Sequence, residues 1–260
     1  MVFQETYLQT DGIEAKIALL KEQYGLVDTT VEGEIKNGFL GLKNIGRCSK
    51  NGEGYKIDIF GKDFSDYLIF HEFLHIQLEE TGRTFDTSQE DPELSDYLFE
   101  LRNLFNDFLI ETEVNRQFGE RYANDVSYTR ERDLRGQFTT GGLAASSLSK
   151  FMLGFTCRAI SEIYPQMRET ISGKLFGETM SWPGFEEFID TVNQYEFSSI
   201  TPSQYREGIQ KLHRCIAGSD ISFAGNKVVF DNPNGVKEVI RGYEKVDAQI
   251  SSLLSAYLGR

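Results

Sequence analysis

The chain has 260 residues, a length that fits one large domain or two lobes with ordinary cores. Hydrophobic residues make up 40% of it and charged residues 26%, which is typical of globular proteins and excludes global disorder. Acidic residues outnumber basic ones by 40 to 27, and the formal net charge of -13 repels phosphate backbones and anionic lipids. Neither nucleic acid nor a membrane is therefore an expected partner.

The cysteines and the apolar runs indicate a cellular compartment. Cys48, Cys157 and Cys215 show no CxxC spacing, and an odd number cannot all pair within one chain, so a reducing compartment is expected. The first residues lack a basic start followed by an apolar run, and no stretch approaches the ~18 consecutive apolar residues of a membrane span. We expect a cytoplasmic protein.

The first predicted elements are a helix and a small sheet. The pattern from Asp11 to Tyr24 predicts a helix, with Asp11 as its cap and apolar residues at helical spacing. From Val31 to Phe60, β-branched and aromatic residues alternate with polar ones among many glycines. The alternation is clearest in Tyr55 to Phe60, so this region predicts a small sheet.

Two further helices are predicted next along the chain. One runs from about Asp66 to Glu80 after a capping Ser65, and Gly82 marks its end. The other begins at Asp91-Pro92, where a capping residue precedes a proline suited to the first helical position, and continues to about Gly119.

The second half of the chain is predicted to be mainly helical. Thr139 to Gly142 forms a break that marks a lobe boundary, after an arginine-rich stretch. Predicted elements follow as helices near Leu143–Ser172, Pro183–Tyr195, Pro202–Ala217 and Val236–Leu258, with a strand or hairpin around Lys227–Phe230. The predicted fold is α+β and mainly helical. We expect two lobes, residues 1–125 with a small sheet packed on the helix of residues 66–80, and a helical lobe of residues 126–260, although one continuous domain also fits the pattern.

The helix of residues 66–80 carries the strongest chemical signal, His71-Glu72-Phe73-Leu74-His75. Residues four apart project from the same helix face, so His71 and His75 can share one metal ion. Zinc takes histidine nitrogen readily, and a catalytic zinc site keeps one position for water. Glu72 lies beside the pair, where a carboxylate can take a proton from the activated water and pass it to a leaving amine. The alternative is an ordinary amphipathic helix whose histidines only make hydrogen bonds.

This pattern resembles the HExxH motif of the zincin metallopeptidases. The resemblance covers about Tyr55 to Gly82, and it implies two histidine ligands, His71 and His75, with Glu72 as general base. The chain continues as Ile76-Gln77-Leu78-Glu79-Glu80-Thr81, without the glycine and third histidine of the metzincin subgroup, so that subgroup is excluded.

The gluzincin pattern instead takes its third ligand from a glutamate on a second helix downstream. The helix that begins at Pro92 offers Glu111 and Glu113. We favour Glu111, because Asp107 and Asn115 lie one turn away on its face and can act as polar second-shell partners, Asp107 by orienting a ligand histidine. One departure from the gluzincin pattern is that this acidic partner precedes the ligand glutamate.

The sequence thus predicts a zinc-dependent metallopeptidase that acts on a peptide or protein, with zinc as its cofactor. The alternative is a zincin-like regulatory or binding protein that keeps the metal with little or no peptidase activity. Its oligomeric state is not predicted.

A donor for the developing oxyanion is also expected. The residues that offer one are Tyr122, Tyr128, Arg130, Arg132 and His213. His213 is otherwise interpreted as a hydrogen-bonded helix residue.

Overall fold

The computed structural model describes residues 2–36, 45–61, 65–139, 147–169 and 184–242. They are mainly helical with a small mixed sheet and a separate hairpin, so the α+β prediction is confirmed at that level. The helices are α1 (Val2–Gln9), α2 (Ile13–Gln23), α3 (Ser65–Glu80), α4 (Pro92–Phe118), α5 (Ala123–Thr139), α6 (Ser147–Ile163), α8 (Phe185–Asn193) and α9 (Pro202–Ala217), with short 3-10 turns η1 (Gly119–Tyr122) and η2 (Pro165–Glu169). The strands are β1 (Val31–Lys36), β2 (Ile45–Asn51), β3 (Gly54–Phe60), β4 (Ile221–Ala224) and β5 (Lys227–Phe230).

The chain forms two compact units, each assembled from separate stretches. Unit 1 comprises residues 1–82 and 113–129, and unit 2 comprises residues 83–112 and 130–260. The helices α4 and α5 each contribute residues to both units. The division into continuous lobes, 1–125 and 126–260, stays a prediction.

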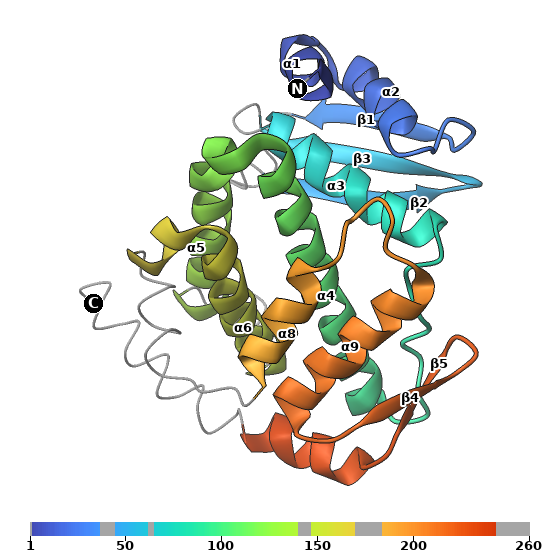
Figure 1. Ribbon diagram of the computed structural model, residues 1–260, viewed down its shortest axis with the longest axis vertical. Coiled ribbons are helices and arrows are strands. Elements are labelled where there is room, and N and C mark those ends of the chain that lie inside the picture. The colour runs from blue at the N-terminus through green and yellow to red at the C-terminus, as the bar shows by residue number, and fades with distance from the viewer. Residues whose placement is uncertain (1, 37–44, 62–64, 140–146, 170–183, 243–260) are drawn as a thin grey trace. The chain divides into compact units, whose positions relative to one another are not determined.

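The sheet of unit 1 has the order β1-β3-β2 (Figure 1). The central strand β3 pairs in parallel with β1 and antiparallel with β2, and Gly52, at φ 63, lies in the tight turn between β2 and β3. The helix α3 follows β3 directly and packs on β2 and β3, while α2 packs on β1 (Figure 1). The sequence therefore predicted this sheet and the helix that carries the motif correctly.

An aromatic cluster forms the core of unit 1 around α3. Phe70 lies at 5.0 Å from Phe118, 5.8 Å from Tyr7 and 6.1 Å from Tyr24, measured between ring centroids. These contacts fix α3 against α1, α2 and the end of α4, because the large rings meet edge-on and those of Tyr7, Tyr24 and Phe70 are buried.

The start of α2 corrects the sequence prediction. Gly12, not Asp11, is the N-cap, and the Lys16 N–H donates to its carbonyl at 3.2 Å. Gly12 has φ 85, a left-handed backbone angle that glycine adopts without the Cβ clash aspartate would meet. The helix α1 was not predicted at all.

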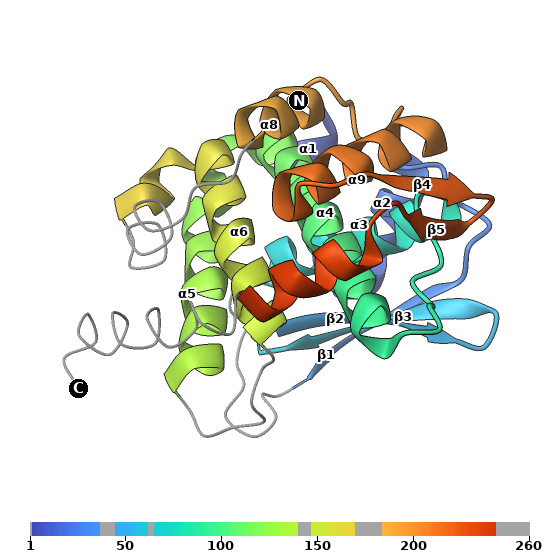
Figure 2. The same ribbon diagram turned by 90° about the horizontal axis from the view of Figure 1, so that it is seen from below.

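Most helices of unit 2 lie close to their predicted positions, but α5 was not predicted, because its stretch was interpreted only as an arginine-rich segment. The helix α9 spans Pro202–Ala217 as predicted, and it lies beside α8 and against β4 of the β4–β5 hairpin (Figure 2). The core contains Phe105 and Phe108 of α4 with Phe188 of α8, at ring-centroid distances of 6.2 and 5.5 Å. A last helix is described at residues 233–242, and the rest of its predicted extent lies outside the described residues. None of the described helices is long and apolar enough to cross a membrane.

Candidate metal centre and general base

The histidine pair of the motif lies on one face of α3 with its ring nitrogens converging. Nε2 of His71 and Nε2 of His75 are 3.2 Å apart. Two ligand nitrogens about 2.0 to 2.1 Å from a tetrahedral zinc ion are about 3.3 Å apart, so the observed spacing fits the ion. It equally suits a hydrogen bond between one protonated and one unprotonated ring, which a metal ion displaces by removing the shared proton.

The histidine pair is partly shielded from solvent. His71 is buried, with 8% of its surface exposed, and its ring lies 5.7 Å from Tyr67, which in turn lies 5.9 Å from Tyr122. His75 is half-buried. A pair that is buried on one side and open on the other suits a site that binds both an ion and a substrate.

The carboxylate of Glu72 lies against strand β2. Its Oε2 accepts a hydrogen bond from the Cys48 backbone N–H at 2.9 Å. Burial, and next the negative charge of Glu72, raise the pKa of the Cys48 thiol. The Glu72 side chain is thus held by β2 in the helix position next to His71.

Glu111 and Asp107 belong to unit 2, where both face an arginine from α5. Nη2 of Arg130 lies 3.0 Å from Oδ2 of Asp107 and 3.7 Å from Oε1 of Glu111. Glu111 and Arg130 are buried, and Asp107 is half-buried. The two acidic residues that the sequence placed on one helix face therefore share an ionic partner.

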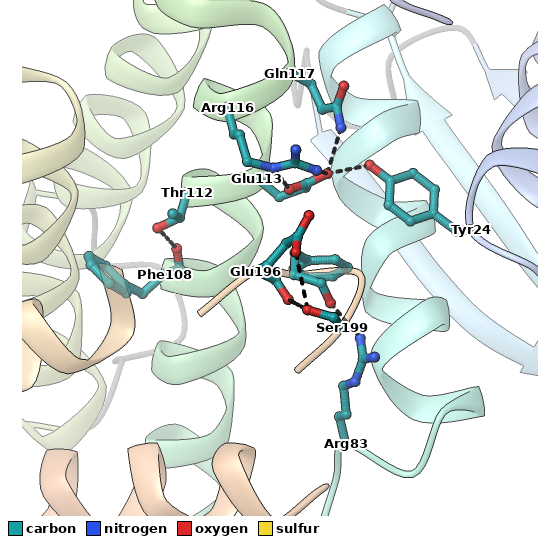
Figure 3. Close-up of polar contacts among 10 residues, drawn as sticks. Tyr24, Arg83, Phe108, Thr112, Glu113, Arg116, Gln117, Glu196 and Ser199 are labelled. Atoms are coloured by element: carbon teal, nitrogen blue, oxygen red, sulfur yellow. Dashed lines mark hydrogen bonds and ion pairs between the residues drawn. The ribbon is translucent and has the colours of Figure 1, made fainter. Parts of the chain in front are cut away.

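Glu113 lies in unit 1 and has a different environment (Figure 3). Oε1 of Glu113 accepts hydrogen bonds from Tyr24 at 2.7 Å, Arg116 at 2.7 Å and Gln117 at 2.9 Å, and Oε2 accepts one from Arg116 at 2.6 Å. Both oxygens of this buried carboxylate are thus used within unit 1. Asn115, the other predicted second-shell residue, is half-buried on the same helix.

His213 is an ordinary buried helix residue, one of the two interpretations made from the sequence. Its Nδ1 lies 2.8 Å from the Tyr97 hydroxyl and its Nε2 lies 3.2 Å from the Ser219 hydroxyl, so both ring nitrogens have partners within unit 2. Burial lowers the pKa of His213 to about 4. It is therefore neutral at pH 7 and has no nitrogen left for an ion.

The other proposed oxyanion donors are scattered in environment. Tyr122 is buried, Tyr128 is 45% exposed and Arg132 is half-buried. Arg130 is engaged with Asp107 and Glu111. None of these is singled out by its geometry.

The sequence did not predict a role for Cys48 and Gly46, which both lie on β2. Cys48 donates to Glu72, and a Cβ added to Gly46 would lie 2.6 Å from Cγ of Glu72. A glycine in the interior of a strand is a known sign of close approach by another group. The glycine was visible in the sequence, but the sequence did not show that Glu72 is the group that approaches it.

Comparisons with known proteins add no family to this picture. No protein-family model, no curated protein and no solved structure matches the chain.

Proposed function

We propose that this protein is a zinc-dependent metallopeptidase with a zincin-like arrangement of its motif helix and sheet. The observation that carries the proposal is the 3.2 Å approach of the His71 and His75 Nε2 atoms on α3, with the Glu72 carboxylate held in the next position of the same helix. A purely structural metal site has no use for a carboxylate held there.

The residues that would hold zinc are His71, His75 and a carboxylate from α4. His71, His75 and Asp107 each carry a donor atom suited to a metal ion. We retain Glu111 as the proposed third ligand over Glu113, since both oxygens of Glu113 already accept hydrogen bonds from Tyr24, Arg116 and Gln117. Asp107 is then a second-shell carboxylate, or the ligand itself if Glu111 only neutralises Arg130.

A bound zinc ion would act as a Lewis acid that polarises the scissile carbonyl and lowers the pKa of a bound water molecule. Glu72 accepts the proton of the attacking water and returns it to the nitrogen of the leaving amine, so it serves first as base and then as acid. The proposed substrate is a peptide or protein.

The first test is metal content. Protein purified without added metal should hold about one equivalent of zinc. His71→Ala or His75→Ala should lose it, because each substitution removes one of the two histidine ligands. His213→Ala is the matched control, since His213 is bonded to Tyr97 and Ser219, and it should keep the zinc. Wild-type protein that stays metal-free when zinc is supplied in excess would rule out the proposal.

The second test separates a peptidase from a binding protein. Glu72→Gln should leave the zinc content and the fold nearly unchanged, but it should lower the cleavage rate by about 10² to 10⁴-fold, because glutamine cannot take the proton. Cleavage of a peptide library is measured by mass spectrometry for wild type, variant and chelator-treated protein. Cleavage that persists in Glu72→Gln contradicts the assigned role, and a zinc-loaded wild type that cleaves nothing favours the regulatory protein.

A further inference from the structure

We propose that Gly46 and Cys48 of β2 are positioning residues for Glu72, so that the edge strand of the sheet sets the orientation of the general base. The catalytic meaning of this inference rests on the proposed peptidase function. Its structural content, that β2 holds the Glu72 carboxylate, rests on the contacts of Gly46 and Cys48 with Glu72.

Gly46 leaves the space that the Glu72 side chain occupies. A Cβ atom added to Gly46 would lie 2.6 Å from Cγ of Glu72, 2.6 Å from its Oε1 and 3.0 Å from its Cδ. Carbon atoms do not approach one another to 2.6 Å without a bond, so any other residue at position 46 displaces Glu72 or moves the strand. Gly46 does not have a positive φ, and the requirement for glycine is therefore steric.

Cys48 fixes the carboxylate from the same strand. Its N–H donates to Oε2 of Glu72, and a hydrogen bond to a carboxylate is shorter and stronger than one between neutral groups. Because alternate residues of a strand share a face, the missing side chain of Gly46 and the Cys48 side chain lie on one side of β2. The half-buried Cys48 thiol is hydrogen-bonded to Glu72 as well, so strand and side chain converge on one carboxylate.

The consequence for catalysis follows from distance. A general base works only within hydrogen-bond reach of the proton it accepts, and a displacement of about 1 Å in an active site can cost about 10²-fold in rate. The histidine pair is set by the helical spacing of α3 alone. The Glu72 carboxylate, in contrast, takes its orientation from a strand that lies 24 residues earlier in the sequence.

Amide hydrogen exchange at Cys48 tests the contact without metal or substrate. The Cys48 N–H donates to Glu72, so Gly46→Ala and Glu72→Ala should each speed its exchange by about tenfold or more. Arg47→Ala, at an exposed position on β2, and Gly242→Ala, where an added Cβ meets nothing within 4 Å, are the matched controls and should leave it unchanged.

The functional readout uses the zinc-loaded full chain. Gly46→Ala should lower kcat for peptide cleavage by about 10²-fold with KM and zinc content unchanged, because it moves the base and leaves the histidine ligands in place. Cys48→Ser, which keeps the backbone donor and a small polar side chain, should retain most of the activity.

The measurements test the Cys48–Glu72 contact, its catalytic role and the proposed function separately. Cys48 exchange that is the same in wild type and Glu72→Ala overturns the contact, and this comparison holds even if Gly46→Ala fails to fold. Fast exchange in Gly46→Ala with full kcat overturns the catalytic role of the contact. A wild type that binds no zinc defeats the proposed function instead, while the exchange measurement still shows whether β2 holds Glu72.

Discussion

At the scale of single residues, Glu111 and Glu113 show how two carboxylates on one helix serve different purposes. They are separated by two positions and project from different faces of α4. Both are almost fully buried, with 0% and 1% of their surfaces exposed. Glu113 is surrounded by three donors, Tyr24, Arg116 and Gln117, and this environment explains its burial without a metal ion.

We therefore expect the two alanine variants to fail in different ways. Glu111→Ala should weaken zinc binding, since it removes the proposed third ligand. Glu113→Ala should keep zinc but lower the free energy of unfolding by about 1–3 kcal/mol, because the buried Tyr24 hydroxyl loses its acceptor. Zinc titration and urea unfolding measure the two effects. Zinc loss in Glu113→Ala but not in Glu111→Ala would exchange their roles.

His213 makes the stability of the protein depend on pH. Its pKa is about 4 in the folded chain, against an ordinary value of 6.5, so the unfolded chain binds more protons between these values. Its contribution is complete above pH 6.5 and is lost as the pH falls towards 4, and it amounts to about 3 kcal/mol. Neighbouring Asp220 opposes this shift only in part.

The test of this pH dependence is the difference between two stability curves. Urea unfolding of wild type and His213→Gln between pH 6.5 and 4 should show a flatter curve for the variant, which has no titrating ring at this position. Parallel curves would show that carboxylates elsewhere account for the acid sensitivity. The variant's lower overall stability does not affect the comparison, because only the slope with pH is compared.

At the scale of elements, the predictions that succeeded rest on local signals. The helix α9 begins after a capping box in which Thr201 and Gln204 exchange hydrogen bonds, with a proline at its first position. The helix α4 begins with a simpler cap, in which Oδ1 of Asp91 accepts from the Glu93 N–H and Pro92 holds the first helical position. Such signals lie within a few residues of the helix end, and for that reason the sequence alone locates them.

The elements and contacts that were missed depend on residues distant in the sequence. The buried Tyr7 of α1 packs on Phe70 and Phe118, which come much later in the chain. The His71–His75 approach could be predicted because helical geometry alone creates it. The Cys48–Glu72 bond could not, since it requires the packing of α3 on β2 to be known.

At the scale of the whole molecule, the excess of acidic side chains is the property that no single contact explains. The formal net charge is -13, from 40 acidic and 27 basic residues. Mutual repulsion among like charges favours the expanded, unfolded chain. Dissolved salt screens that repulsion, since the Debye length falls from about 30 Å at 0.01 M to about 8 Å at 0.15 M.

We expect salt to stabilise this protein in consequence. In chelator, so that metal binding does not contribute, raising sodium chloride over that range should raise Tm, by about 2–4 °C for each kcal/mol of repulsion relieved. Glu22 and Glu53 are exposed, and Glu22→Lys with Glu53→Lys moves the net charge towards zero. The double variant should respond less to salt than wild type, whereas an equal response would mean that the salt acts through the solvent and not through the charge of the protein.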